Sequence, residues 1–143
     1  MNIDGINNGI VLDHISAGKG MRIYELMKLD RLDCMVAIIQ NASSTKFGKK
    51  DIIKVDGTGF KLDLDMLGYI DQHITVDTIE NGRLVKKQHV DLPEELTNVI
   101  RCHNPRCITS VEQGIDQKFR LSNRQKKTYR CVYCDTEYRE KED

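Results

Sequence analysis

The chain has 143 residues, of which 22 are Lys or Arg and 22 are Asp or Glu, so its formal net charge is zero. This balance disfavours a strongly basic nucleic-acid-binding protein and an acidic disordered tail as descriptions of the whole chain. The longest wholly apolar run, Cys34–Ile39, is far shorter than the roughly 20 residues of a membrane helix. No Lys or Arg precedes Lys19, which is unlike a signal peptide, so we expect a cytoplasmic protein.

Strand and helix patterns alternate through the first two thirds of the chain. In chain order we expect a strand at 9–15, a helix at 21–29, a strand at 34–40, a polar loop at 41–48, a strand at 50–55, a helix at 62–70 and strands at 74–80 and 83–90. Asn81-Gly82 favours a tight hairpin between the last two strands, because both residues tolerate positive φ. The order βαββαβ plus a hairpin strand predicts an α+β fold with an N-terminal ferredoxin-like sheet domain and helices on one face.

A change in composition divides the chain near Pro93. With a boundary after Thr97, the first part carries a net charge of −3 and the second part +3. Four of the five cysteines lie in the second part, whereas Cys34 lies in an apolar run and is expected to be a core residue. We therefore predict two domains, residues 1–97 and a small β-rich domain at 98–143.

The four C-terminal cysteines form two close pairs. Four residues separate Cys102 from Cys107, and two separate Cys131 from Cys134. Two such pairs on two loops can bring four thiolates to the corners of a tetrahedron, the geometry of a closed structural Zn²⁺ site. A domain this small rarely folds without a metal or disulfides. We expect one structural zinc ion per chain; an iron–tetrathiolate site, free thiols and replacement of one ligand by His103 are the alternatives.

Lysines recur on neighbouring expected strands. Lys50 and Lys54 are four residues apart on one strand and therefore point to the same face. Lys86 and Lys87 lie on the return strand of the hairpin, where a regular two-residue turn pairs Asp77 with Lys86. A solvated strand face is the ordinary interpretation. A polyphosphate site is the alternative, because lysine binds phosphate as a point charge.

The segment 118–130 carries six basic residues and two aromatic ones between the cysteine pairs. In zinc ribbons such stretches can bind nucleic acid, so a nucleic-acid-binding zinc-ribbon protein is an alternative function. A charged hairpin facing solvent and a protein interface are also open. No nucleophile and base are arranged for catalysis, and we therefore expect no enzymatic activity.

Several runs, taken together and in order, resemble the regulatory chain of aspartate carbamoyltransferase. They are GIVLDHI at 9–15, GKKDIIK at 48–54, LPE at 92–94, NVI at 98–100 and the two cysteine pairs. The resemblance implies a non-catalytic subunit with an N-terminal nucleotide-binding allosteric domain and a C-terminal zinc domain that docks on the catalytic chain. It implies regulatory dimers that bridge catalytic trimers, inhibition by CTP and UTP, activation by ATP, control of pyrimidine biosynthesis, and no nucleic-acid or membrane partner.

The resemblance also carries individual residues over. The implied nucleotide contacts are Asp13 and His14 as a pair, Lys54 and Lys87 at ribose and phosphate, Lys50 in support, and Ile6, Ile79 and Leu84 around the base, with the segment 3–6 lining the site. Cys102, Cys107, Cys131 and Cys134 match the zinc ligands. Three positions depart from the better-known members: Asp77 replaces an asparagine, Gly82 an aromatic residue and Asn7 a basic residue.

Overall fold

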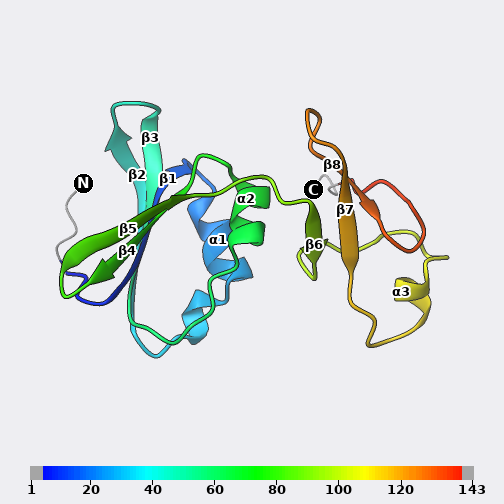
Figure 1. The fold of residues 1–143 in the computed structure, drawn as a ribbon, viewed down its shortest axis with the longest axis horizontal. Helices are drawn as coiled ribbons and strands as arrows, with labels where there is room; N and C mark the ends of the chain where they lie inside the picture. The colour runs from blue at the N-terminus through cyan, green and yellow to red at the C-terminus, as the bar shows by residue number, and fades with distance from the viewer. Residues whose placement is uncertain (1–4, 140–143) are drawn as a thin grey trace. The chain divides into compact units, whose positions relative to one another are not determined.

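The computed structural model describes residues 5–139, and the chain divides into two compact units, Met1–Asp91 and Leu92–Asp143 (Figure 1). The first unit contains, in chain order, β1 (Gly9–Ser16), α1 (Gly20–Leu26), the 3₁₀ helix η1 (Leu29–Arg31), β2 (Met35–Ser44), β3 (Gly48–Asp56), α2 (Leu64–Ile70), β4 (Thr75–Glu80) and β5 (Arg83–His89). The second unit contains β6 (Glu95–Thr97), α3 (Ile108–Val111), β7 (Lys118–Asn123) and β8 (Thr128–Cys131).

The first unit has the predicted ferredoxin-like arrangement. Its five-stranded sheet has the order β2-β3-β1-β4-β5, and every neighbouring pair is antiparallel. Both α-helices cover the same face of this sheet (Figure 1). The α+β class, with an N-terminal sheet domain and a small β-rich C-terminal domain, is confirmed.

The main core of the first unit lies between the sheet and the two helices. Leu12 faces Ile53 on one side and Val76 on the other, and all three are almost completely buried. Ile23 of α1 and Leu67 of α2 are also fully buried. Alternation along each strand therefore sends one set of side chains toward the helices and leaves the other set on the opposite face, where the predicted nucleotide contacts lie.

Helix α1 is shorter than the helix expected at 21–29. It ends at Leu26, and Lys28 adopts a positive φ of 53° before η1 begins. The change of direction buries Leu29 at 2% exposure. The helix α2 begins where Asp63 accepts a hydrogen bond from the backbone N–H of Met66, an N-cap that satisfies a free donor of the first turn.

The polar loop expected at 41–48 is mostly strand. β2 continues to Ser44 and pairs with β3 from Gly48 onward, so the connection is only three residues long at 45–47. A bulge between Ile39 and Ala42 places Asn41 at a φ of 58°. The polar composition of this segment reflects an exposed edge strand, which is paired on one side only.

The register of the β4–β5 hairpin also differs from the expectation. Asp77 pairs with Lys87, and Thr78 pairs with Lys86, because the register shifts between Thr78 and Ile79. The pairing of Asp77 with Lys86 was therefore wrong by one position. The shift brings Asp77 and Lys87 to the same face of the sheet.

The C-terminal unit begins earlier than the boundary predicted after Thr97. Leu96 of β6 pairs with Phe119 of β7, and the hydroxyl of Tyr129 donates to the backbone oxygen of Pro93. These long-range contacts make residues 92–97 part of the second unit, whose sheet has the order β6-β7-β8. Phe119, Tyr129 and Leu96 are at most 2% exposed and form its small core. Across residues 5–139, no helix has the length and apolar character needed to cross a bilayer.

Candidate functional site

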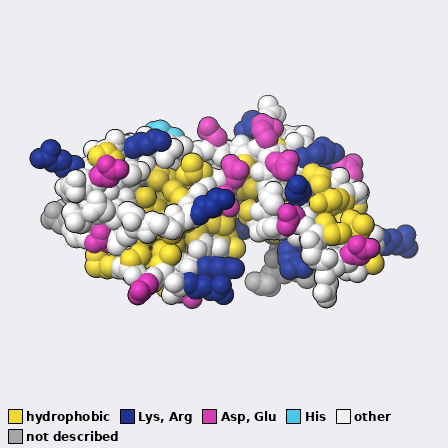
Figure 2. Space-filling view, turned by 60° about the horizontal axis from the view of Figure 1, so that its bottom comes forward, with side chains coloured by type: hydrophobic (Ala, Val, Ile, Leu, Met, Phe, Trp, Pro, Cys, Tyr) yellow, Lys and Arg dark blue, Asp and Glu magenta, His cyan; other side chains and the backbone are white. Residues whose placement is uncertain are grey.

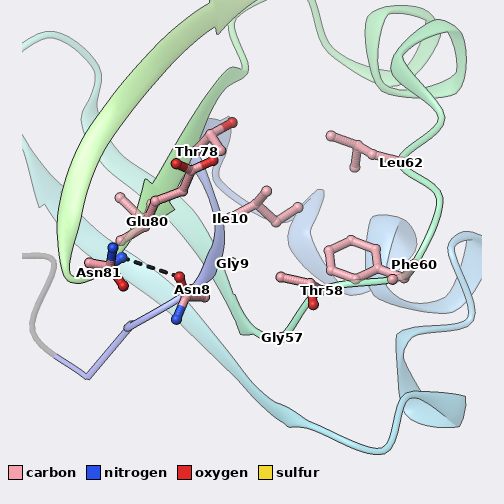
Figure 3. Close-up of a pocket in the computed structure, with 12 residues that line it drawn as sticks. Asn8, Gly9, Ile10, Gly57, Thr58, Phe60, Leu62, Thr78, Glu80 and Asn81 are labelled. Atoms are coloured by element: carbon pink, nitrogen blue, oxygen red, sulfur yellow. Dashed lines mark hydrogen bonds between the residues drawn. The ribbon is translucent and has the colours of Figure 1, made fainter.

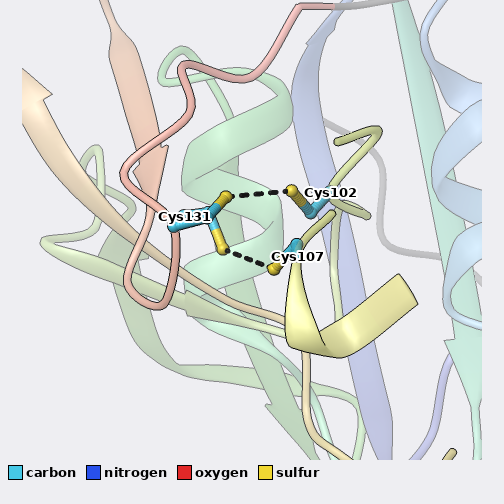
Figure 4. Close-up of side chains that lie close together, drawn as sticks. Cys102, Cys107 and Cys131 are labelled. Atoms are coloured by element: carbon cyan, nitrogen blue, oxygen red, sulfur yellow. Dashed lines mark hydrogen bonds between the residues drawn. The ribbon is translucent and has the colours of Figure 1, made fainter. Parts of the chain in front are cut away.

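The four C-terminal cysteines meet in one cluster. Cys102 and Cys107 come from the segment before α3, while Cys131 ends β8 (Figure 4). Cys134 follows in the next turn. All four sulfur atoms lie within 4.8 Å of one another. The structure thus assembles the predicted ligand set from two short loops.

The sulfur spacing fits a tetrahedral metal site. Cys102 Sγ lies 3.6 Å from Cys134 Sγ, and Cys107 Sγ lies 3.7 Å from Cys131 Sγ. A tetrahedron with a metal–sulfur distance of about 2.3 Å has edges of about 3.8 Å, whereas a disulfide brings its sulfurs to about 2.05 Å. The separations therefore match four thiolates around one ion. Four cysteine ligands would fill a tetrahedral coordination shell and leave no open position for a catalytic water.

Hydrogen bonds and burial affect these thiols differently. Burial raises the pKa of Cys102 to about 12, and burial also raises the pKa of Cys131. Burial opposes ionisation of Cys134 as well, but hydrogen bonds from Thr136 and Asn104 lower the pKa of Cys134 to about 6. The positive charge of a bound cation would favour the thiolate forms of Cys102 and Cys131, whose pKa values burial raises.

Two threonines support the cluster and were missed in the sequence. Thr109 donates its hydroxyl proton to Cys107 Sγ at 3.1 Å, and Thr136 Oγ1 lies 3.2 Å from Cys134 Sγ. Each threonine follows the last cysteine of its pair by two residues, a repeated Cys-x-Thr spacing that was the available signal. Gln117 also contributes, because its side-chain oxygen accepts the backbone N–H of Cys102 at 2.9 Å.

The other candidate ligands do not join this cluster. His103 stacks on Tyr138 with ring centroids 5.7 Å apart and is absent from the group of sulfur atoms. Cys34 belongs to the other unit and is only half-buried, with its sulfur packed against Gly57. Neither residue therefore substitutes for one of the four cysteines.

The charged residues of the first unit line up across the face that the helices leave uncovered. Lys54 pairs with Val11, Val11 with Asp77, and Asp77 with Lys87, so these four residues form one cross-strand row over β3, β1, β4 and β5. Directly opposite residues share a face and have Cβ atoms about 4.5–5.5 Å apart. The row therefore places Lys54 and Lys87 on either side of the carboxylate of Asp77.

Asp13, His14 and Lys50 lie beside this row. Lys50 Nζ forms an ion pair with Asp13 at 3.0 Å. The β1 strand has a bulge between Leu12 and Ile15, and His14 there has a φ of 58° and contacts Thr75 Oγ1 through Nδ1 at 3.0 Å. Bulges of this kind redirect side chains, and here the bulge brings two consecutive residues into one site.

The surroundings of Asp13 and His14 lower the pKa of both groups, which favours the charged form of Asp13 and the neutral form of His14. Burial tends to raise the pKa of Asp13, but hydrogen bonds from Lys50 and from the backbone N–H of His14 hold that pKa below its usual value of 3.8. Burial lowers the pKa of His14, and Lys50 and Lys87 lower it further while Asp13 opposes them. Asp13 is therefore an anion that positions Lys50, and His14 favours its neutral form.

An apolar patch adjoins the charged residues on the same face. Ile6, Val11, Ile52 and Ile79 form one buried cluster, and Leu84 pairs with Ile79 from the neighbouring strand. Leu84 itself is 51% exposed. Ile6, Ile79 and Leu84 therefore lie close together, with Leu84 exposed and the two isoleucines buried. Residues 3 and 4 of the predicted segment 3–6 lie outside the described residues.

Among the described residues, cavities lie on both faces of this sheet. One of about 480 Å³ is lined by His14, Thr75, Lys87 and His89 together with the 45–47 turn and His73. The other, of about 350 Å³, lies where Ile10, Phe60 and Leu62 approach one another (Figure 3). The second cavity has no basic residue in its lining. Of these two cavities, the first therefore suits an anionic ligand better.

Family models match both units. The first matches residues 1–91 as "Aspartate carbamoyltransferase regulatory chain, allosteric domain", and the second matches residues 94–143 as "Aspartate carbamoyltransferase regulatory chain, metal binding domain". This chain belongs to the family of aspartate carbamoyltransferase regulatory chains. A curated relative with that name from Clostridium botulinum is 47% identical over 96% of this chain and 94% of its own length. Relatives of the same name from Bifidobacterium longum and Clostridium acetobutylicum are 42% identical (96% and 98% of the two chains) and 46% identical (97% and 94%).

Membership makes this a regulatory rather than a catalytic polypeptide, with an allosteric and a metal-binding domain. The matched ranges agree with the observed division near residue 91. The aspartate carbamoyltransferase regulatory-chain family therefore accounts for both units of the structure.

The nucleic-acid alternative loses its support in the structure. Phe119 and Tyr129, the two aromatic residues of the basic segment 118–130, are buried in the core and cannot stack on bases. Arg120 forms an ion pair with Asp135. Arg124 likewise pairs with a glutamate and donates to a backbone oxygen. The segment is a structural hairpin of the metal-binding domain.

Proposed function

We propose that the chain binds CTP, UTP and ATP through its N-terminal unit and transmits their effect to the catalytic chain of aspartate carbamoyltransferase, thereby controlling pyrimidine biosynthesis. The observation that carries this proposal is the juxtaposition, on one sheet face, of the lysine row with the apolar cluster. The unit concerned is the one that matches the allosteric-domain model.

The two halves of this face suit the two ends of a nucleotide. Leu84, which is half exposed and lies beside the buried Ile6 and Ile79, offers an apolar surface for a base. Lys54 and Lys87 offer positive charge for ribose and phosphate, supported by Lys50. Lysine holds phosphate as a point charge without requiring a glycine-rich loop, which this sequence does not contain.

Substitution of the lysines tests the nucleotide site. Lys54→Ala and Lys87→Ala each remove a charge from the site and should weaken CTP and ATP binding about tenfold, the order expected for loss of a charged contact. Lys86→Ala is the matched control, because Lys86 pairs with Thr78 and belongs to the other set of alternating side chains. Calorimetric titration measures affinity, and zinc analysis should give the same content for all variants.

Unchanged affinities in both Lys54→Ala and Lys87→Ala would remove these residues from the site. An equal loss in Lys86→Ala would instead indicate a general effect of surface charge. Either result would contradict the proposed nucleotide site without affecting the family membership.

We further propose that the metal is a single Zn²⁺ ion held by Cys102, Cys107, Cys131 and Cys134. The tetrahedral spacing, the four sulfur ligands and the small core support zinc in a structural role. Such a thiolate site also fits the reducing conditions of the cytoplasm, where we place the protein. Elemental analysis of the purified chain tests the assignment; iron at one equivalent in place of zinc would refute it.

Apolar side chains surround the metal loops at the surface. Ile108 and Val111 of α3 are 46% and 71% exposed, and Val132 and Tyr133, between two of the cysteines, are 40% and 44% exposed. Figure 2 shows apolar side chains gathered at the surface of this unit. Exposed patches of this kind typically mark protein interfaces. We propose that the catalytic chain docks here and that the ion fixes the loops that present these residues.

The bridging of catalytic trimers requires two regulatory chains to associate. The edge strand β2 supports this part of the proposal, because it is paired on one side only and exposes Met35 and Ile39. An unpaired apolar edge is a ready template for a second chain. Sedimentation of the isolated regulatory chain should therefore show a dimer.

A thiol reagent or chelator tests the docking of the C-terminal unit. Loss of zinc should release free catalytic trimers from the assembly, detectable by analytical ultracentrifugation. Val111→Asp should weaken assembly while retaining zinc, and Arg83→Asp, an exposed change in the other unit, should not. Persistence of the intact assembly after complete zinc loss would contradict the proposed role of the metal.

A further inference from the structure

The cavity of about 350 Å³ lies on the helix-facing side of the first unit's sheet. It is found where β1 begins and β4 ends, and the loop 57–62 after β3 forms its other wall (Figure 3). Ile10 lies two residues before the core residue Leu12 on β1 and points to the same face. Thr78 pairs with Ile10 and shares that face. The cavity is therefore on the opposite side of these strands from the lysine row.

The wall of this cavity is apolar and includes an aromatic ring. Ile10, Phe60 and Leu62 approach one another around the hollow, and each of them is partly exposed (Figure 3). The volume lies within the range of small-molecule pockets, about 300–1,000 Å³. Aromatic rings pack on one another in offset or edge-to-face arrangements. A compact planar ring can therefore pack against Phe60 and fill the space between the two aliphatic side chains.

The rim of the cavity supplies hydrogen-bonding groups and one negative charge. Thr58 and Thr78 contribute hydroxyl groups, and Asn8 and Asn81 contribute amides. Among the described residues that line the cavity, Glu80 carries the only charge. Its carboxylate has no ion-pair partner within residues 5–139, although Arg83 lies opposite it in β5. A carboxylate accepts hydrogen bonds from N–H groups and repels anions.

We propose that this cavity binds a small planar ring that carries an amino or amidino group, at a site separate from the proposed nucleotide site. The ring packs against Phe60, and its N–H groups donate to the carboxylate of Glu80 and to the threonine hydroxyls of the rim. A positively charged amidine is attracted further by the face of the aromatic ring. Compounds that carry phosphate or carboxylate are rejected, because the lining offers them negative charge and no basic residue.

The test uses benzamidine and benzoate, two probes of the same shape and opposite charge. The zinc-loaded full chain, isotope-labelled for NMR, is titrated with each probe while its backbone amide signals are followed. Benzamidine should bind with a Kd in about the millimolar range, the order expected for a probe of about nine non-hydrogen atoms. It should shift the amides of residues 8–10, 57–60 and 78–81, and saturating CTP should not displace it. Benzoate should bind at least about tenfold more weakly.

Two variants separate the roles of the ring and the charge. Phe60→Ser should weaken benzamidine binding about tenfold, whereas Phe47→Ser, which changes an exposed aromatic residue outside this lining, should leave it unchanged. Glu80→Gln, an exposed change, should bring the affinities for benzamidine and benzoate to within about threefold of each other. Equal affinity for the two probes in the wild type, or unchanged benzamidine binding in both Phe60→Ser and Glu80→Gln, would overturn the inference. Displacement by CTP with shifts confined to the lysine row would also overturn it, because benzamidine would then occupy the nucleotide site.

Discussion

Asp51 is the carboxylate that we expect to matter most for the stability of the N-terminal unit. It is completely buried. One oxygen accepts the backbone N–H groups of Gly18 and Gly20 at 3.1 and 3.0 Å, and the other accepts that of Asn41 at 3.1 Å. These bonds hold the start of α1 and the bulge of β2. The side chain of Lys50, its neighbour in β3, supports the proposed nucleotide site.

Replacing Asp51 with alanine removes all three bonds. The N–H of Gly20 is buried and the other two are part-buried, so the losses should be about 2 kcal/mol for the first and about 1 kcal/mol for each of the others. The expected cost of about 4 kcal/mol is a large share of a typical domain stability of about 5–15 kcal/mol. It corresponds to a Tm lower by about 15–30 °C for a domain of this size.

Urea denaturation of the first unit's secondary structure measures this cost, with zinc content as the check on the second unit. Asp51→Asn keeps one acceptor oxygen and should lose about half as much stability. Asp56→Ala is the matched control: Asp56 lies on the same strand and accepts two N–H groups, from Asn7 and Asn8, but nearer the surface, where water can replace it. Equal losses in Asp51→Ala and Asp56→Ala would refute the reasoning.

Three further outcomes are expected. Gly68→Ala should destabilise the chain in thermal unfolding, although alanine favours helices, because the added Cβ would lie 1.8 Å from the backbone oxygen of Asp91. Cys131→Ser should abolish stoichiometric metal in elemental analysis, whereas Cys34→Ser should retain it. The pKa of Asp13, measured by NMR, should lie below 3.8, because its hydrogen bonds outweigh the effect of burial. The stability that Asp13 contributes is then present above the pKa of the unfolded state and is lost as the pH falls through the pKa of the folded state. A titration midpoint above 3.8 would contradict this prediction.

Local patterns were sufficient to predict most elements and the metal cluster. Alternation along β3 placed Lys50 and Lys54 on one face, as the register confirms. The cysteine spacing predicted the four-sulfur cluster, because close pairs on two loops have few ways to fold except around an ion. These signals depend on neighbours within a few residues and can be read from sequence directly.

The register of the hairpin could not be predicted in the same way. Gly82 donates its backbone N–H to Asn7, and Asn81 donates to the side chain of Asn8 (Figure 3). These partners lie more than seventy positions away in the chain. Contacts of this kind accompany the shift that brings Asp77 opposite Lys87. β6 has the same origin, since three residues become a strand only by pairing with β7.

The two proposed sites differ in what they need in order to form. The lysine row draws on β1, β3, β4 and β5, so it exists only when the whole sheet is in register. The cysteine cluster draws on two loops and can be assembled by the ion itself. Sheet variants should therefore lose nucleotide binding and keep metal, and cysteine variants should do the reverse. A nucleotide can act at a distance only through different affinities for two states of the assembly, and the polypeptide that joins the two units passes from Asp91 to Leu92. A junction variant that keeps both ligands but loses regulation would locate the coupling there.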